Sequence, residues 1–324
     1  MEKSRDLSAC AAISQILNGR ASPHPSPGEH LSLQRRMLFP RVDTKNPVAV
    51  AALVRETFVR LFPGAATTWI ERIFGDVETL FAGRHPDYAP IDLRYHDLEH
   101  TLQATVCLTL LLEGYQTSGE QSGITARQFE LAVASGLLHD AGYLKLRSDT
   151  VGTGAKYTFC HVLRSCSFAA SYLPSLGATE SEVGGVLGAI NCTGPTKEIS
   201  RLHFQDPVER FVGCALATAD YLGQMAAPDY PDELEILFSE FMESDDYVHL
   251  PVERRMFQSA DDLIARTPDF WRKIVRPKLE KDFEGVHRYL AEPYPDGHNA
   301  YLEAVERNIA IIEARLARAA ARAG

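Results

Sequence analysis

The sequence lacks the features that mark a membrane-spanning, secreted or nucleic-acid-binding protein. No stretch approaches the ~18 uninterrupted apolar residues that a spanning helix needs, so no membrane partner is expected. The charged start, MEKSRDLSAC, is not followed by an apolar segment, so no signal peptide is expected either. Basic residues are in the minority, 33 against 43 acidic ones, and the formal charge of -10 indicates no footprint on nucleic acid.

Cysteines are few and form no C-x-x-C pair. They lie mostly among apolar residues, which favours buried free thiols in a reducing compartment. With the lack of a signal peptide, this predicts a cytoplasmic protein. The six cysteines stand at positions 10, 107, 160, 166, 192 and 214.

Alternating strand patterns are scarce, and the periodicity from Pro47 onward is helical almost throughout. Helix and strand are both disfavoured in the stretch ASPHPSPGEH, residues 21–30, because it contains prolines, serines and a glycine. We therefore predict a flexible N-terminal arm at 1–45 and a single all-α domain at 46–324. Helices are expected at 48–62, 67–82, 96–115, 126–139, 156–173, 180–190, 207–226, 231–243, 270–291 and 299–322.

Two of these helices bring polar residues to one point. The first carries His100 on its apolar face and extends for about 22 Å to Tyr115. The second returns for about 20 Å from Ala126 to His139. The short connection favours antiparallel neighbours, so His100 should come level with His139 and Asp140. An aspartate at a helix C-terminus is unfavourable against the helix dipole, and a bound cation would offset that cost.

A third helix contributes another carboxylate. Asp206 and Pro207 predict its N-cap and first turn, and Asp220 lies further along on a face of small residues. A buried, unpaired carboxylate is costly, so Asp220 has a basic partner or coordinates a metal. Taken singly, these residues could be a core histidine, a turn aspartate and half of an ion pair.

The ordered set YHDLEHT, LLHD and TADYLGQM resembles the HD superfamily of metal-dependent phosphohydrolases. YHDLEHT is similar in particular to the Y-H-N-x-x-H-A/T motif of the cyclic-nucleotide phosphodiesterases. The likeness spans about residues 94–226, with helices at 231–322 completing the domain. It implies an HD-domain helical bundle with a metal site between core helices.

The resemblance also implies roles for individual residues. His100, His139, Asp140 and Asp220 would hold the tighter of one or two divalent ions (Zn, Mn, Fe or Mg), and Asp140 would bridge to the second. Such ligands leave positions open for water, which the metal activates for in-line attack on phosphorus. His96 would be the general acid that protonates the leaving oxygen.

Three more residues are candidates for the site. His161 is expected to bind or orient the second metal, with a plain core histidine as the alternative. His203 could complete an H…HD…H…H…D set, with a surface-loop histidine as the alternative. Lys156, in the loop RSDTVGTGAKY, could contact a phosphate, although an ordinary flexible loop also fits.

The sequence departs from the phosphodiesterases at several points. Asp97 stands where they usually carry asparagine, and Glu99 adds a further acid. The segment AINCTG, residues 189–194, lacks the aspartate of their A-T-D stretch. Gln258 is a guess for the glutamine that clamps a purine. These departures weaken the prediction of a cyclic-nucleotide substrate and leave that of a phosphohydrolase intact.

We therefore expect a phosphohydrolase of small-molecule phosphoesters, with a phosphodiester such as a cyclic nucleotide favoured. The alternatives are a nucleotidase acting on phosphomonoesters, a dinuclear iron oxygenase of the same superfamily, and a regulatory module without catalysis. The oxygenase would need both His161 and His203 as ligands. The sequence does not predict the oligomeric state.

Overall fold

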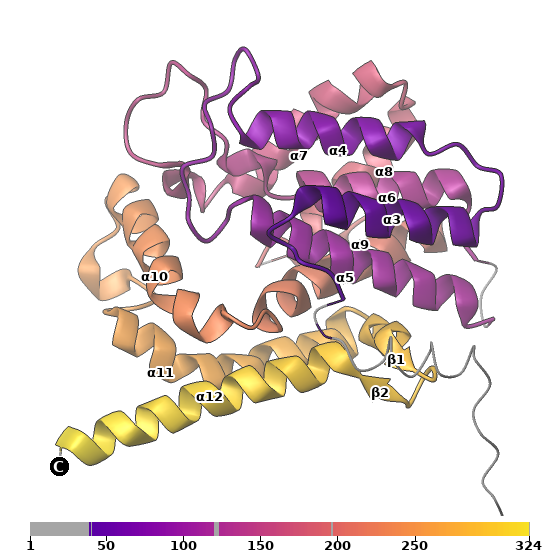
Figure 1. Cartoon of the computed structure of the whole chain (residues 1–324). Coiled ribbons are helices and arrows are strands. Elements are labelled where there is room, and N and C mark those ends of the chain that lie inside the picture. Colours follow the sequence, from indigo (N-terminus) through magenta and orange to yellow (C-terminus); the bar gives the residue numbers. More distant parts are fainter. Residues whose placement is uncertain (1–38, 40, 120–122, 196, 324) are drawn as a thin grey trace, which may run out of the picture. The chain divides into compact units, whose positions relative to one another are not determined.

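The computed structural model describes residues 39, 41–119, 123–195 and 197–323, which fold almost entirely into helices (Figure 1). The prediction of an all-α fold is confirmed. The strands that these residues contain are two-residue segments, β1 (Ala291–Glu292) and β2 (His298–Asn299), which pair antiparallel. The long helices are α3 (Pro47–Leu61), α4 (Thr68–Phe81), α5 (Leu98–Thr117), α6 (Ala126–Leu138), α7 (His161–Tyr172), α8 (Glu180–Asn191), α9 (Pro207–Met225), α10 (Tyr230–Tyr247), α11 (Ala260–Phe270) and α12 (Ala300–Ala323).

Helix α5 is the centre of the bundle and is buried along most of its length. It packs against α9, α6 and α3, which surround it in Figure 1. Its threonines can be buried because their hydroxyls donate to the carbonyl four residues earlier, as Thr105 does to Thr101 and Thr109 does to Thr105. The central helix therefore carries polar residues without leaving these hydroxyls unpaired.

The ends of the helices around α5 follow from their capping residues. Asp97 begins α5 by accepting the amide of His100, and Asp206 caps α9 ahead of Pro207 as predicted. A capping box of Thr125 and Gln128 starts α6. These caps determine where α5, α6 and α9 start, and thereby which residues of neighbouring helices lie side by side.

Two predicted helices are wrong in their extent. The helix expected at 270–291 is divided into the π-helical segments η6 (Trp271–Val275) and η7 (Lys278–Asp282) and the 3₁₀ turn η8 (Val286–Leu290). The chain stays helical through Pro277 as far as Asp282, and Glu284 and Gly285, at φ 57° and 69°, then separate η7 from η8. The helix expected at 156–173 begins only at His161, after a separate 3₁₀ turn, η2 (Gly154–Tyr157).

The arm predicted at 1–45 lies mostly outside the described residues, and its flexibility stays a prediction. Residues 39–324 form one compact unit. Within that unit Phe39 meets Tyr301 edge-on with ring centroids 4.9 Å apart, and Lys45 Nζ lies 3.0 Å from Asp229 Oδ2. In the part of the chain that the structure describes, no helix has the length and apolar character required to cross a membrane.

Close packing of α5 and α9 depends on Gly223. A Cβ at this position would lie 2.9 Å from the backbone nitrogen of Ala104 on α5. We expect Gly223→Ala to lower the free energy of unfolding by about 1–3 kcal/mol, because the two backbones must separate. Gly75→Ala on exposed α4, where a Cβ meets nothing within 4 Å, should instead stabilise by about 0.5–1 kcal/mol. Chemical denaturation of both variants measures this, and equal changes would contradict the packing role of Gly223.

Candidate metal centre

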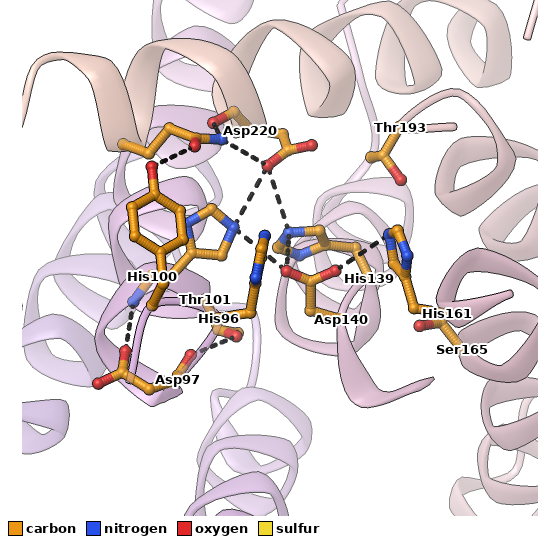
Figure 2. A network of polar contacts seen from close by, with 12 residues as sticks. His96, Asp97, His100, Thr101, His139, Asp140, His161, Ser165, Thr193 and Asp220 are labelled. Carbon is orange, nitrogen blue, oxygen red and sulfur yellow. Dashed lines mark hydrogen bonds and ion pairs between the residues drawn. The ribbon is translucent and has the colours of Figure 1, made fainter. Parts of the chain in front are cut away.

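Three helices bring two histidines and two aspartates, residue types that ligate metals, to one point in the interior (Figure 2). His100 lies in the first turn of α5, and His139 follows the last residue of α6 with Asp140 directly after it. Asp220 comes from α9. The antiparallel course of α5 and α6 thus brings His100 level with the His139–Asp140 pair, as their lengths predict.

The ligand atoms of these residues face one another. Asp140 Oδ2 lies 3.2 Å from His100 Nε2 and 3.3 Å from His139 Nε2. Asp220 Oδ1 lies 3.4 Å and 3.6 Å from the same two nitrogens. His100, His139 and Asp140 form a buried group that could hold a metal ion. Separations of this size fit a common ion at metal–ligand distances of roughly 2.0–2.2 Å.

The hydrogen bonding of the imidazoles also fits metal binding. His139 Nδ1 lies 2.8 Å from the carbonyl oxygen of Gly136, so Nδ1 carries the proton and Nε2 presents its lone pair to Asp140 and Asp220. The Nε2 atoms of His100 and His139 are buried and make no hydrogen bond of good geometry. A divalent ion would satisfy both nitrogens and offset the two carboxylate charges.

The acid–base properties of the group follow from its burial and its internal contacts. Burial opposes ionisation of Asp140, yet the neighbouring His139 and His100 hold the pKa of its carboxyl well below the usual range. Burial likewise opposes charge on His100, but its proximity to Asp140 and Asp220 raises the pKa of the imidazole to about 10. In the metal-free protein, a proton on His100 therefore supplies the charge that a metal ion would bring.

His161 faces the other oxygen of Asp140. Its Nε2 lies 3.7 Å from Asp140 Oδ1, while its Nδ1 is 2.7 Å from the carbonyl oxygen of Thr158 (Figure 2). Burial lowers the pKa of His161, which favours the neutral imidazole that a metal ligand requires. The close approach of α7 depends on Gly142, since a Cβ there would lie 2.0 Å from the His161 carbonyl oxygen.

His96 does not lie on the helix expected at 96–115, because Asp97 is the N-cap and α5 begins at Leu98. An irregular segment presents His96 instead, and Glu240 of α10 holds that segment. The buried carboxylate of Glu240 accepts the backbone amides of Arg94 and Tyr95 and lies 2.7 Å from His96 Nδ1. Burial alone would raise the pKa of Glu240, but its contact with His96 and these amides lower it overall.

Sequence reasoning missed Glu240. The available signal was its place on an apolar helical stripe with Tyr230, Leu234 and Leu237. A carboxylate on such a stripe requires a partner, but the sequence does not reveal which residue that partner is.

Tyr95 and Gln224 fix the orientation of Asp220. The Tyr95 hydroxyl donates to Gln224 Oε1 at 2.7 Å, which turns the amide nitrogen of Gln224 toward α9. That nitrogen donates to the Asp220 backbone carbonyl at 2.9 Å and lies 3.4 Å from Asp220 Oδ1. The YHDLEH and ADYLGQ motifs are thus joined by one hydrogen-bonded path to the metal centre.

Several other candidates are engaged elsewhere. Lys156 is buried and its ammonium group lies 2.6 Å from Asp149 Oδ1, so contact with a phosphate stays a prediction. His203 is exposed in the loop before α9, whereas the metal-binding group is buried. Gln258 is also exposed, and its amide nitrogen donates to the carbonyl of Val252 at 3.0 Å.

Polar contacts hold the loop that contains Lys156 and the residues just before it. Lys145 Nζ lies 2.8 Å from Asp92 Oδ2. Thr153 donates through both its amide and its hydroxyl to the carboxylate of Glu243 on α10. Helix α10 therefore holds this loop with Glu243 and the His96 segment with Glu240.

A small acidic cavity of about 10 Å³ lies beside His100. Asp97, Glu99 and Glu233 line it, in agreement with the extra negative charge expected near the motif. Burial and the nearby Asp229 and Glu99 raise the pKa of Glu233 to about 7. A larger cavity of about 280 Å³ lies between the N-terminal ends of α6, α8 and α9, at the opposite end of α6 from His139.

No protein-family model matches the chain, and no curated protein shows significant similarity to it. The likeness to HD phosphohydrolases therefore depends on the sequence motifs and on the buried His–His–Asp group.

Replacement of Asp140 tests the metal centre. We expect Asp140→Asn to lose most of the bound metal, because the amide removes a charge that faces both His100 and His139. Metal content of the purified protein, measured by mass spectrometry after reloading, gives the result. Asp97→Asn is the matched control, since asparagine also caps helices well and Asp97 lies outside the group. Equal metal content in all three proteins would contradict the site.

Metal affinity should depend on pH. The pKa of His100 in the metal-free protein is about 10, so below that pH a metal ion must displace a proton. We expect affinity to rise between pH 7 and 9 by about tenfold per pH unit for each proton displaced. Competition with a chelator of known pH dependence measures the affinity, and an affinity independent of pH would contradict this coupling.

Proposed function

We propose that the chain is a metal-dependent phosphohydrolase and that its substrate is a small phosphodiester. The observation that carries this proposal is the convergence of His100, His139, Asp140 and Asp220 on one buried point beside His96. A divalent ion bound there would supply Lewis acidity, both to activate water and to offset the charge of the phosphate.

The two oxygens of Asp140 support a second metal position. Oδ2 faces His100 and His139, while Oδ1 faces His161. A carboxylate with its oxygens divided in this way is suited to bridging two ions. We assign His161 as the protein ligand on the second side, which makes it the candidate for a weaker, exchangeable ion.

His96 is suited to protonate the leaving oxygen. Its Nδ1 donates to the carboxylate of Glu240, so Nε2 carries a proton only in the doubly protonated imidazolium, and that proton is the one that would be donated. A carboxylate on Nδ1 also stabilises the charged imidazolium, the form that donates. His96 is half-buried, with 15% of its side chain exposed, so it remains accessible to a substrate.

The charges around the site favour a diester over a monoester. A phosphomonoester carries most of a second negative charge at pH 7, since its second pKa is about 6, and a diester carries only one. The cationic side chains that follow Asp140 are already occupied: Lys145 binds Asp92, Lys156 binds Asp149, and Arg164 donates to the carbonyls of Gly142 and Leu144. They supply little additional charge for a dianion, which makes the nucleotidase alternative less favourable.

The oxygenase alternative has weaker support. It requires His161 and His203 together, and only His161 lies close to Asp140. For the substrate, the YHDLEHT motif suggests a cyclic nucleotide. Because Gln258 already binds backbone carbonyls, no purine clamp supports that choice, and the proposal ends at the class of small phosphodiesters.

Replacement of His96 tests the proposed proton donor. We expect His96→Asn to retain metal and to slow cleavage of diesters with alkoxide leaving groups by about 10²–10⁴-fold. Cleavage of bis-p-nitrophenyl phosphate should fall far less, because nitrophenolate leaves without protonation. Glu240→Gln should show the same selectivity to a smaller degree, since it weakens the hold on Nδ1.

The matched control is His298→Asn. His298 also pairs with a glutamate, Glu303, at 2.5 Å, but it is exposed at β2. This variant should keep both rates. A uniform loss across leaving groups in His96→Asn would contradict the general-acid role, and phosphoester cleavage that persists in Asp140→Asn would contradict the metal-dependent reaction.

A further inference from the structure

The ring of Tyr143 stacks on two histidines of the proposed site. It stacks on His96 with ring centroids 4.7 Å apart and planes 23° apart. It also stacks on His161, with centroids 4.6 Å apart and planes 9° apart. One aromatic ring is thus in face contact with two imidazoles that the proposed function uses, which points to a role in holding them.

Each of these histidines has one hydrogen bond that fixes only part of its orientation. His96 Nδ1 is held by Glu240, and His161 Nδ1 by the carbonyl of Thr158, both at 2.7 Å. A single in-plane bond leaves an imidazole free to tilt about the line of that bond. Contact of the whole ring face with Tyr143 removes this freedom, so bond and stack together fix the direction of Nε2.

Tyr143 is itself firmly held. It belongs to the 3₁₀ turn η1 (Ala141–Tyr143), which starts directly after Asp140, and its side chain is 1% exposed. Its hydroxyl is in hydrogen-bond contact with Thr158, the residue whose carbonyl also holds His161. Burial, followed by the charge of Asp140, raises the pKa of the phenol well above its usual range, so the ring stays neutral. It acts through its face and adds no charge to the site.

We propose that Tyr143 is a positioning residue whose ring holds both His96 and His161 by stacking. It would thereby fix the proton donor and the second-metal ligand relative to each other and to Asp140. The role follows from the stacking of His96 and His161 on Tyr143, which lies three residues after the proposed metal ligand Asp140. This inference depends on the proposed function for its catalytic consequence, although the stack itself can be tested without any reaction.

The test compares Tyr143→Phe, which keeps the stacking ring, with Tyr143→Leu, which removes it. We expect Tyr143→Phe to keep the wild-type leaving-group dependence and metal content. Tyr143→Leu should slow alkoxide-leaving diesters by up to about 10²-fold, because a misplacement of ~1 Å costs that much. It should affect bis-p-nitrophenyl phosphate less, and bind less of the weaker metal ion. If Tyr143→Leu does not fold, Tyr143→Met replaces it, since methionine fills irregular gaps.

Tyr115→Leu controls for the loss of a buried aromatic stack. Tyr115 stacks on Phe211 with centroids 3.8 Å apart, near the end of α5 remote from His100. This variant should lose stability and keep both the leaving-group dependence and the metal content. If Tyr143→Leu behaves like Tyr115→Leu, Tyr143 has only a structural role and the inference is overturned. An equal loss in Tyr143→Phe would overturn it too, because the hydroxyl and not the ring face would then matter.

A readout without catalysis separates this inference from the proposed function. The carbon-bound protons of His96 and His161 should show ring-current shifts in the nuclear magnetic resonance spectrum of the wild type and Tyr143→Phe. These shifts should disappear in Tyr143→Leu, and uptake of the weaker metal ion should be reduced. If the wild type cleaves no phosphoester, the proposed function fails. Unchanged histidine shifts and metal uptake in Tyr143→Leu would reject the positioning role itself.

Discussion

The buried carboxylate of Asp140 is the constraint on which the rest of the site depends. A charged group that is 3% exposed is stable only with compensating partners, and Asp140 draws these from different elements of the bundle. His100 of α5 and His139 after α6 approach one oxygen, and His161 of α7 approaches the other. Gly142 and Ser165 then bring α7 close, since the Gly142 amide donates to the Ser165 hydroxyl at 2.8 Å. The packing of these helices thus also supplies the partners that stabilise the charge of the Asp140 carboxylate.

A second buried carboxylate, that of Glu240, positions the segment that carries His96. Glu240 accepts two successive backbone amides and meets His96, so it positions an irregular segment that has no helical hydrogen bonds of its own. Asp140 and Glu240 have different partners and suit different tasks. The first is surrounded by groups that suit a metal ion, and the second by donors that fix a histidine. Two buried acids in one protein thereby acquire separate roles from their surroundings.

The sequence predicted those parts of the site that depend on helix length and capping. Asp97, Thr125 and Asp206 set the starts of α5, α6 and α9, and helical geometry then brings His100 to His139 and Asp140. It did not predict Glu240 or the stacking of Tyr143, because both depend on contacts between segments that helical periodicity does not relate. It also misplaced His96, which precedes the N-cap Asp97 and so lies outside the helix, and it extended a helix beyond Asp282.

Helix α10 contributes none of the four proposed ligands, but it holds two segments near the site. All four proposed ligands of the tighter ion come from α5, the end of α6, and α9, whereas the hold on His96 and on the loop at Thr153 comes from Glu240 and Glu243, one turn apart on α10. Under the proposed function, affinity for the ion and competence for proton transfer would therefore be separable properties. A change that displaced α10 alone would then leave a protein that binds the ion but reacts slowly, and ion content by itself would be a poor measure of the active fraction in a preparation.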